Sequence, residues 1–166
     1  MLLKPEDYFT PDGWRLNPNI LQNKGWASAV VEELPGDEET VQIAKLLEGQ
    51  EVNLIYRNVF NNIDEYINSK SVVVQKGNID EIIFDYTLCP FILTSTNPEF
   101  LLFIPDDNQY HVVCGPKDTV EKIIKIIGKT IAEARSRFDV YAAISPPDGQ
   151  ANFKKIADTY FRDTVT

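Results

Sequence analysis

The stretch over residues 100–115, FLLFIPDDNQYHVVCG, constrains the fold most strongly, because two apolar runs stand on either side of a short acidic and amide segment. Apolar runs of this length are typical of strands, and Asp and Asn between them favour a tight turn. We therefore predict a β-hairpin. A hairpin pairs antiparallel strands, so the chain is expected to contain an antiparallel sheet.

Four further strands are expected before this hairpin, over residues 26–34, 71–76, 80–88 and 91–95. In DEIIFDYTL, the segment over 80–88, apolar residues alternate with polar ones, which predicts a half-buried strand. Short turns separate the last three of these segments and the hairpin. Strands joined in this way form a meander.

Helices are expected over residues 37–49, 118–138 and 151–161, where apolar residues recur at helical spacing. The second of these carries the longest apolar stripe, with Asp118 as its expected N-cap. We expect this long helix to lie across the buried face of the meander.

The segment over residues 51–70 is less simple, because Val52, Leu54 and Tyr56 alternate as in a strand. Over its full length, however, the apolar residues hold a spacing of three and four. This spacing favours a helix or a broken pair of helices, with Asn62 and Glu65 capping the second piece.

These elements predict an α+β fold, in which an antiparallel meander of about four to six strands packs against a long amphipathic helix. Further helices are expected in the N-terminal half and at the C-terminus. The chain has 166 residues. Residues 1–25 are rich in Pro, Gly, Asn and Asp and predict an irregular N-terminal arm, and 26–166 are expected to form a single domain.

Acidic residues outnumber basic ones by 25 to 16, which gives a net charge of −9. Such a chain repels phosphate backbones and anionic lipid surfaces, so neither nucleic acid nor a membrane is expected as its partner. The excess belongs to residues 1–110, which hold 18 acids and 7 bases. An acidic field of this kind favours the capture of a basic protein. The sequence leaves a homodimer open.

The compartment is predicted from the cysteines and from the first residues. Only Met1–Leu3 form an apolar run before Lys4, which is shorter than the core of a secretory signal. Cys89 and Cys114 are too few for a disulfide scaffold and are expected as reduced thiols. We therefore expect a cytoplasmic protein.

Cys114 lies three residues from the only histidine, His111. Side chains alternate between the faces of a strand, so the two should project to opposite sides of the sheet. Cys114 is then expected as a buried small hydrophobe and His111 as an edge or surface residue. Cys89 could still approach His111 across neighbouring strands, which keeps open a small enzyme or ligand-binding domain with a pocket between sheet and helix.

No catalytic residue, metal site or cofactor is predicted. The chain has three Cys and His residues in total, without the paired spacing of a zinc site. The acidic loop of the hairpin, with Asp106, Asp107 and Asn108, lacks a calcium-loop pattern and favours a plain turn. Nucleophile-elbow, dinucleotide and phosphate-loop motifs are also missing.

Surface acids with interleaved aromatics remain as the candidate site. Carboxylates set the register against Lys and Arg of a partner, while aromatic side chains supply desolvated anchors. A twisted sheet could gather several of them beside exposed tyrosines. The candidate partner-binding residues are Asp80, Glu81, Asp85, Tyr86, Glu99, Asp106, Asp107 and Tyr110.

The segment over residues 91–124, FILTSTNPEFLLFIPDDNQYHVVCGPKDTVEKII, resembles small bacterial proteins of the toxin-immunity type. It shares with them a strand, a Pro turn, two further strands around acidic turn residues, Gly-Pro and an amphipathic helix. The resemblance implies an α+β protein that neutralises a cognate toxin by binding, and it identifies no functional residues. An accessory subunit whose N-terminal arm docks onto a larger assembly is a further hypothesis.

Overall fold

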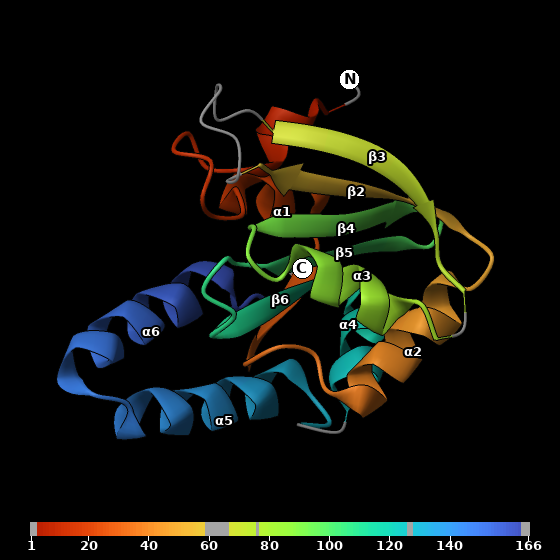
Figure 1. Ribbon diagram of the computed structural model, residues 1–166. Helices are drawn as coiled ribbons and strands as arrows, with labels where there is room; N and C mark the ends of the chain where they lie inside the picture. Colours follow the sequence, from red (N-terminus) through yellow and green to blue (C-terminus); the bar gives the residue numbers. More distant parts are fainter. Residues whose placement is uncertain (1–2, 59–66, 76, 126–127, 164–166) are drawn as a thin grey trace.

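The computed structural model describes residues 3–58, 67–75, 77–125 and 128–163. These residues form an α+β fold with one antiparallel sheet, as predicted. The strands of this sheet are β1 (Ala27–Glu32), β2 (Glu51–Arg57), β3 (Ile67–Val73), β4 (Phe91–Thr96), β5 (Glu99–Ile104) and β6 (Tyr110–Gly115). Their spatial order is β1-β6-β5-β4-β2-β3 (Figure 1).

The predicted hairpin is confirmed. β5 and β6 pair antiparallel, with Leu101 opposite Cys114 and Phe103 opposite Val112. β4 lies beside β5 and corresponds to the strand predicted over 91–95. β4, β5 and β6 therefore form the expected meander. The strand expected over 26–34 is β1, which closes one edge of the sheet against β6.

The helical elements of the described residues are η1 (Pro5–Tyr8), α1 (Pro18–Lys24), α2 (Asp37–Leu47), α3 (Ile79–Tyr86), α4 (Lys117–Ile124), α5 (Ile131–Ile144) and α6 (Pro147–Tyr160). α2 and α6 confirm two of the predicted helices. At the start of α2, the Glu39 carboxylate accepts a hydrogen bond from the Gly36 amide at 3.0 Å. This contact satisfies one of the amides that a helix start leaves unpaired.

Helices cover both faces of the sheet. One core cluster joins the first face to α2, α3 and α4, and a second joins the opposite face to α1 and α6. Along β4, Phe91 and Leu93 belong to the first cluster and Ile92 to the second. α5 runs along the β1 edge and contributes Ile131 to one cluster and Phe138 to the other (Figure 1). Because both faces are buried, consecutive apolar residues occur along the central strands, as in Phe100–Ile104 of β5.

The prediction of a helix over residues 51–70 is wrong. The structure forms β2 and β3 there, and β2 is inserted between β3 and β4 with Leu54 opposite Leu93. Val52 and Leu54 face one core cluster while Ile55 faces the other, so burial on both faces produced the apparent helical spacing. The expected cap by Asn62 and Glu65 lies outside the described residues.

The prediction of a strand over residues 80–88 is also wrong, because this segment forms α3. Two acids in its first turn, Asp80 and Glu81, favour a helix start through the helix dipole. Ile79 and Ile83, one helical turn apart, are the residues that α3 buries. The strand expected over 71–76 is present only in part, as the end of β3.

The long helix expected over residues 118–138 is divided into α4 and α5, and its N-cap is Pro116 rather than Asp118. Gly128 lies between the two helices, where a Cβ atom would come within 2.8 Å of the Ala134 amide nitrogen. The Thr130 hydroxyl then accepts a hydrogen bond from the Glu133 amide at 3.2 Å and begins α5. The apolar stripe of the sequence therefore serves two helices rather than one.

Residues 1–25, predicted as an irregular arm, contain η1 and α1 in their described part. Phe9, Leu16 and Leu21 from this region are buried in the second core cluster. The Tyr160 hydroxyl donates a hydrogen bond to the Leu16 carbonyl oxygen at 2.8 Å, which joins this region to α6. The N-terminal region is therefore part of the packed core.

Candidate functional site

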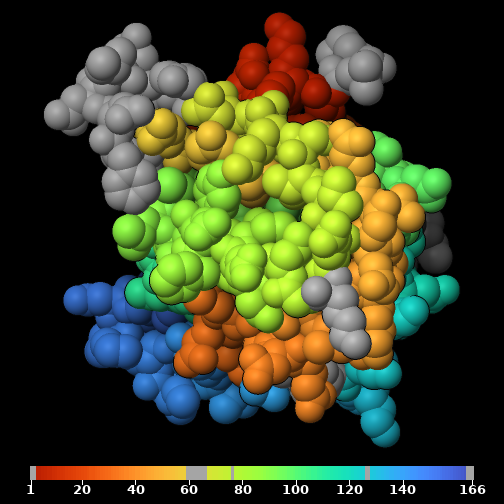
Figure 2. All heavy atoms as spheres, turned by 45° about the vertical axis from the view of Figure 1, so that its right-hand side comes forward, coloured from red at the N-terminus to blue at the C-terminus, as the bar shows by residue number. Residues whose placement is uncertain are grey.

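The outward face of α3 combines acidic and large apolar side chains. Asp80 and Phe84 lie one helical turn apart, and Leu88 follows just after the helix ends. The exposed fractions of Phe84 and Leu88 are 77% and 63%. Glu81 and Asp85 form a parallel acidic row on the same helix. In the space-filling view, the yellow-green atoms of α3 lie beside the orange atoms of α2 on one face of the molecule (Figure 2).

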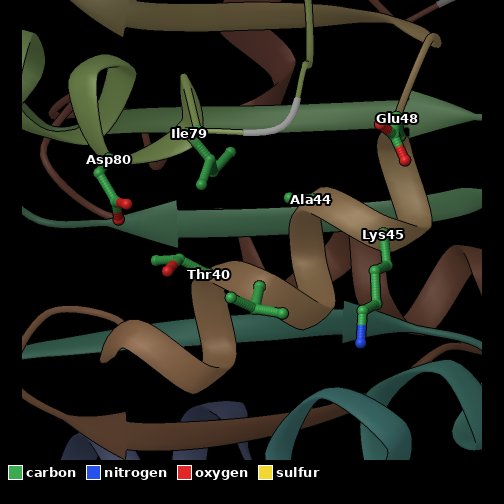
Figure 3. A pocket seen from close by; sticks show the side chains of 8 residues that line it. Thr40, Ala44, Lys45, Glu48, Ile79 and Asp80 are labelled. Atoms are coloured by element: carbon green, nitrogen blue, oxygen red, sulfur yellow. The ribbon is translucent and has the colours of Figure 1, made fainter.

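A groove of about 360 Å³ lies between α2 and α3. Its lining residues are Thr40, Val41, Ala44, Lys45, Glu48, Gly77, Ile79 and Asp80. Ile79 points into the space between the helices, toward Ala44 (Figure 3). Asp80 and Glu48 lie at opposite ends of the groove, whereas the Lys45 side chain extends away from Ile79 (Figure 3). The floor is therefore apolar and the two ends carry carboxylates.

Three carboxylates of this face, those of Glu48, Asp80 and Glu81, form no ion pair with a Lys or Arg of the described residues. The fourth differs, because a hydrogen bond with Tyr86 and the charge of Asp85 both raise the pKa of the Lys70 amine. The ion pairs of the described residues that join Lys or Arg to an acid involve Arg15, Lys117, Arg135 and Arg137. None of those pairs includes Glu48, Asp80 or Glu81. We call the set of Val41, Glu48, Asp80, Glu81, Phe84, Asp85 and Leu88 the α2–α3 surface.

The hairpin acids have a different environment. Arg15 Nη1 lies 3.5 Å from Asp106 Oδ1, and Arg15 Nη2 lies 3.7 Å from Asp107 Oδ2. The N-terminal region thus supplies the cation that balances the loop. Asn108 Nδ2 donates a hydrogen bond to the Thr87 carbonyl oxygen at 2.7 Å, so the loop also contacts the end of α3.

The other three candidate residues have environments of their own, and among them Tyr110 lies near the hairpin acids. Glu99 begins β5 at the end of the strand opposite the hairpin loop, and its Oε2 accepts a hydrogen bond from Trp26 Nε1 at 3.4 Å. Tyr110, expected to be exposed, is fully buried in the second core cluster. Tyr86 is half-buried, with its ring centroid 4.9 Å from that of Tyr56. The eight predicted residues therefore do not form one patch, and Asp80 of α3 is the one among them that lines the groove.

The side chains of His111 and Cys114 project from opposite faces of the sheet, as the alternation along a strand predicts. Cys114 packs in the second cluster, whereas the His111 ring contacts Glu33 and Glu39 beyond the first face. The prediction that His111 lies at an edge or on the surface is wrong, because its exposed fraction is 0%. β6 is an interior strand between β1 and β5, which explains this burial.

Both ring nitrogens of His111 are engaged. Nδ1 lies 2.7 Å from the Glu33 carbonyl oxygen and donates to it, and Nε2 lies 3.0 Å from Glu39 Oε1. Burial raises the pKa of Glu39, but the hydrogen bond and charge of His111 and the Gly36 amide outweigh it and hold this pKa below its usual value. The ionised Glu39 carboxylate is therefore held in place by two partners, the His111 ring and the Gly36 amide.

This arrangement leaves neither ring nitrogen of His111 available to activate a thiol. Burial raises the pKa of the Cys114 thiol well above its usual range, which keeps it protonated. Cys89 is also buried. A second pocket of about 370 Å³ borders the pair, but two of its carboxylates already have partners: Glu39 with His111, and Glu32 with Arg137 at 2.6 Å.

Within the described part of the chain, no three His, Cys, Asp or Glu side chains are arranged so that they could hold a metal ion. Among the same residues, no helix has both the length and the apolar character needed to cross a bilayer. Comparisons of the chain with protein-family models, with curated proteins and with solved structures found no match.

Sequence reasoning missed Val41, Glu48, Phe84 and Leu88 as members of a common surface. Asp80, Phe84 and Leu88 recur every four residues, and so do Glu81 and Asp85, which is a helical spacing. That signal competes with the strand-like alternation in the same segment. The position of α2 beside α3 has no local signal, because it depends on how both helices pack on the sheet.

Proposed function

We propose that the protein is a non-enzymatic protein-binding module that takes a basic partner on the α2–α3 surface. One observation supports this most: Asp80 and Glu81, which form no ion pair with a Lys or Arg of the described residues, lie on the same helix as Phe84, and both Phe84 and Leu88 are largely exposed. Apolar anchors surrounded by charged groups are a recurring feature of protein interfaces.

The scaffold under this surface supports such a role. Ile43 and Leu47 of α2 and Ile79 and Ile83 of α3 are buried against the sheet, so both helices are fixed on their inner sides. A surface held in place in this way loses little conformational entropy when a partner binds. The net charge of −9 adds attraction toward a basic partner.

Within this class we propose an immunity-type protein that neutralises a basic toxin by covering its surface. The resemblance over residues 91–124 and the acidic surface both favour this function. Occlusion requires a rigid, complementary surface and no catalytic group on the binder. Such binding is expected to weaken as salt is added, because exposed charges are screened.

The test uses the tagged full chain to retrieve proteins from the cells that carry its gene, and then purifies the retrieved protein for direct binding. Two double variants are compared with the unmodified protein. Asp80→Lys with Glu81→Lys reverses the charge of the α2–α3 surface. Asp118→Lys with Asp148→Lys is the matched control, because these acids are also exposed and also lie in first helical turns, those of α4 and α6.

The expected result is a basic protein that binds the unmodified chain and the control variant directly, loses binding to the α3 variant, and binds more weakly at higher salt. If the partner is a toxin, co-expression of the unmodified chain should protect cells and the α3 variant should not. Equal loss of binding in both variants, or a partner with an acidic binding surface, would contradict the proposal.

A further inference from the structure

The groove between α2 and α3 has a floor and walls of apolar atoms. Val41, Ala44 and Ile79 line it, and Val41 itself is 49% exposed. Val41 and Ala44 lie on one face of α2, about one helical turn apart, and Glu48 follows just after the helix ends. An apolar strip of this kind can cover the alkyl part of a long side chain from a partner.

Carboxylates mark the two ends of this apolar strip. Asp80 lies at the start of α3, next to Thr40, and Glu48 lies just after the end of α2 (Figure 3). Neither forms an ion pair with a Lys or Arg of the described residues. Lys45 borders the groove, but its side chain extends away from Ile79 and leaves the apolar floor uncovered (Figure 3).

This combination selects among possible occupants. A purely apolar side chain would leave both carboxylates without a partner, and an acidic one would be repelled. A second copy of this chain is disfavoured by its net charge of −9. Lysine and arginine side chains have an alkyl stem and a cationic end. The groove offers apolar contacts to the stem and a carboxylate to the cationic end.

We infer that the α2–α3 groove is a receptor for one lysine or arginine side chain of a protein partner, and this inference rests on the proposed function. The alkyl stem packs on Ala44 and Ile79. The cationic group pairs with Asp80 or Glu48. Phe84 and Leu88, outside the groove, contact apolar residues next to that basic residue. The centre of the interface therefore binds a basic side chain of the partner.

A titration of the isotope-labelled full chain tests this inference without the partner. The probes are N-acetylarginine methylamide, its lysine analogue, and two neutral analogues that contain citrulline or norleucine. Binding of each probe is measured from the changes in the backbone amide NMR shifts of the protein. Citrulline keeps the length and shape of arginine without its charge. The protein variants are Asp80→Asn, with Asp118→Asn as a control at another helix start.

We expect the arginine and lysine probes to shift amides of α2 and the start of α3 in a saturable way, and the neutral probes not to saturate over the same range. Asp80→Asn should weaken binding about two- to fivefold, the effect of one exposed ion pair, while Asp118→Asn leaves it unchanged. Equal shifts from arginine and citrulline, stronger binding of norleucine, or shifts centred elsewhere would overturn the inference.

The outcome also separates this inference from the proposed function. A basic partner that needs Asp80 and Glu81, together with no response to the cationic probes, would refute the groove as a receptor and leave the binding module standing. Cationic probes bound at the groove, with no partner that depends on α3, would refute the proposed function and show a site for small basic molecules.

Discussion

His111 of β6 and Glu39 of α2 form a buried pair, with Nε2 3.0 Å from Oε1. The same carboxylate accepts the Gly36 amide at the start of α2. The pair therefore joins an interior strand to the first turn of the helix that forms one side of the groove. It positions α2, and through α2 it positions one half of the candidate binding surface.

Replacing His111 with Leu should lower the free energy of unfolding by about 3–5 kcal/mol, because it leaves the Glu39 charge buried without its partner. Urea unfolding followed by circular dichroism measures this. Asp139→Asn, which removes an exposed ion pair with Arg135, should cost less than about 1 kcal/mol and serves as the control. In a double-mutant cycle, His111→Leu with Glu39→Leu should cost clearly less than the sum of the single changes. Additive losses would show that the pair is not coupled.

The stability of the protein should fall in acid through Glu39. Its folded-state pKa lies below the usual value of 4.5, so its ionised form contributes stability that is complete above that pH and is lost as the pH falls through the folded-state pKa. Unfolding free energies measured from pH 7 to pH 3 should decline more steeply in the unmodified protein than in Glu39→Gln. Parallel curves for the two proteins would contradict this assignment.

Phe84→Ala and Leu88→Ala should change the free energy of unfolding by no more than about 0.5 kcal/mol, since both side chains are mostly in water. They should nevertheless weaken partner binding, measured by calorimetry with the retrieved protein. Ile144→Ala is the matched control, because Ile144 is 78% exposed on α5. Similar binding losses from the control would place the interface elsewhere.

Cys114 should react very slowly with iodoacetamide at neutral pH in the folded protein, because its thiol is fully buried and its pKa is raised. Labelling should become fast only in urea. Peptide mass spectrometry distinguishes it from Cys89. Rapid labelling of Cys114 without denaturant would instead support a reactive thiol and an enzymatic role.

The elements predicted correctly are those with a local signal. The hairpin is evident from two apolar runs around Asp106 and Asp107, and α2 from its acidic first turn and helical spacing. The buried position of His111 has no such signal. That burial depends on β1, which covers the edge of β6 and places Val31 opposite His111. β1 lies about eighty residues before β6 in the chain, so no local pattern indicates the contact.

The errors arose where two periods overlap in one short segment. In 80–88, alternate residues are apolar, yet Ile79 and Ile83 are the ones that become buried, because a helix at this point covers the sheet face. In β2, burial on both faces imitated a helical pattern. The groove could not be predicted either, since it exists only where α2 and α3 pack side by side.

Hydrogen exchange of the chain in complex with its retrieved partner tests the central claim most directly. Amides of α2 and α3, and of the residues that follow α3, should exchange more slowly in the complex than in the free protein, while α5 and α6 remain unchanged. Protection confined to α5 and α6 or to the hairpin loop, with α2 and α3 unaffected, would contradict the assignment of the binding surface.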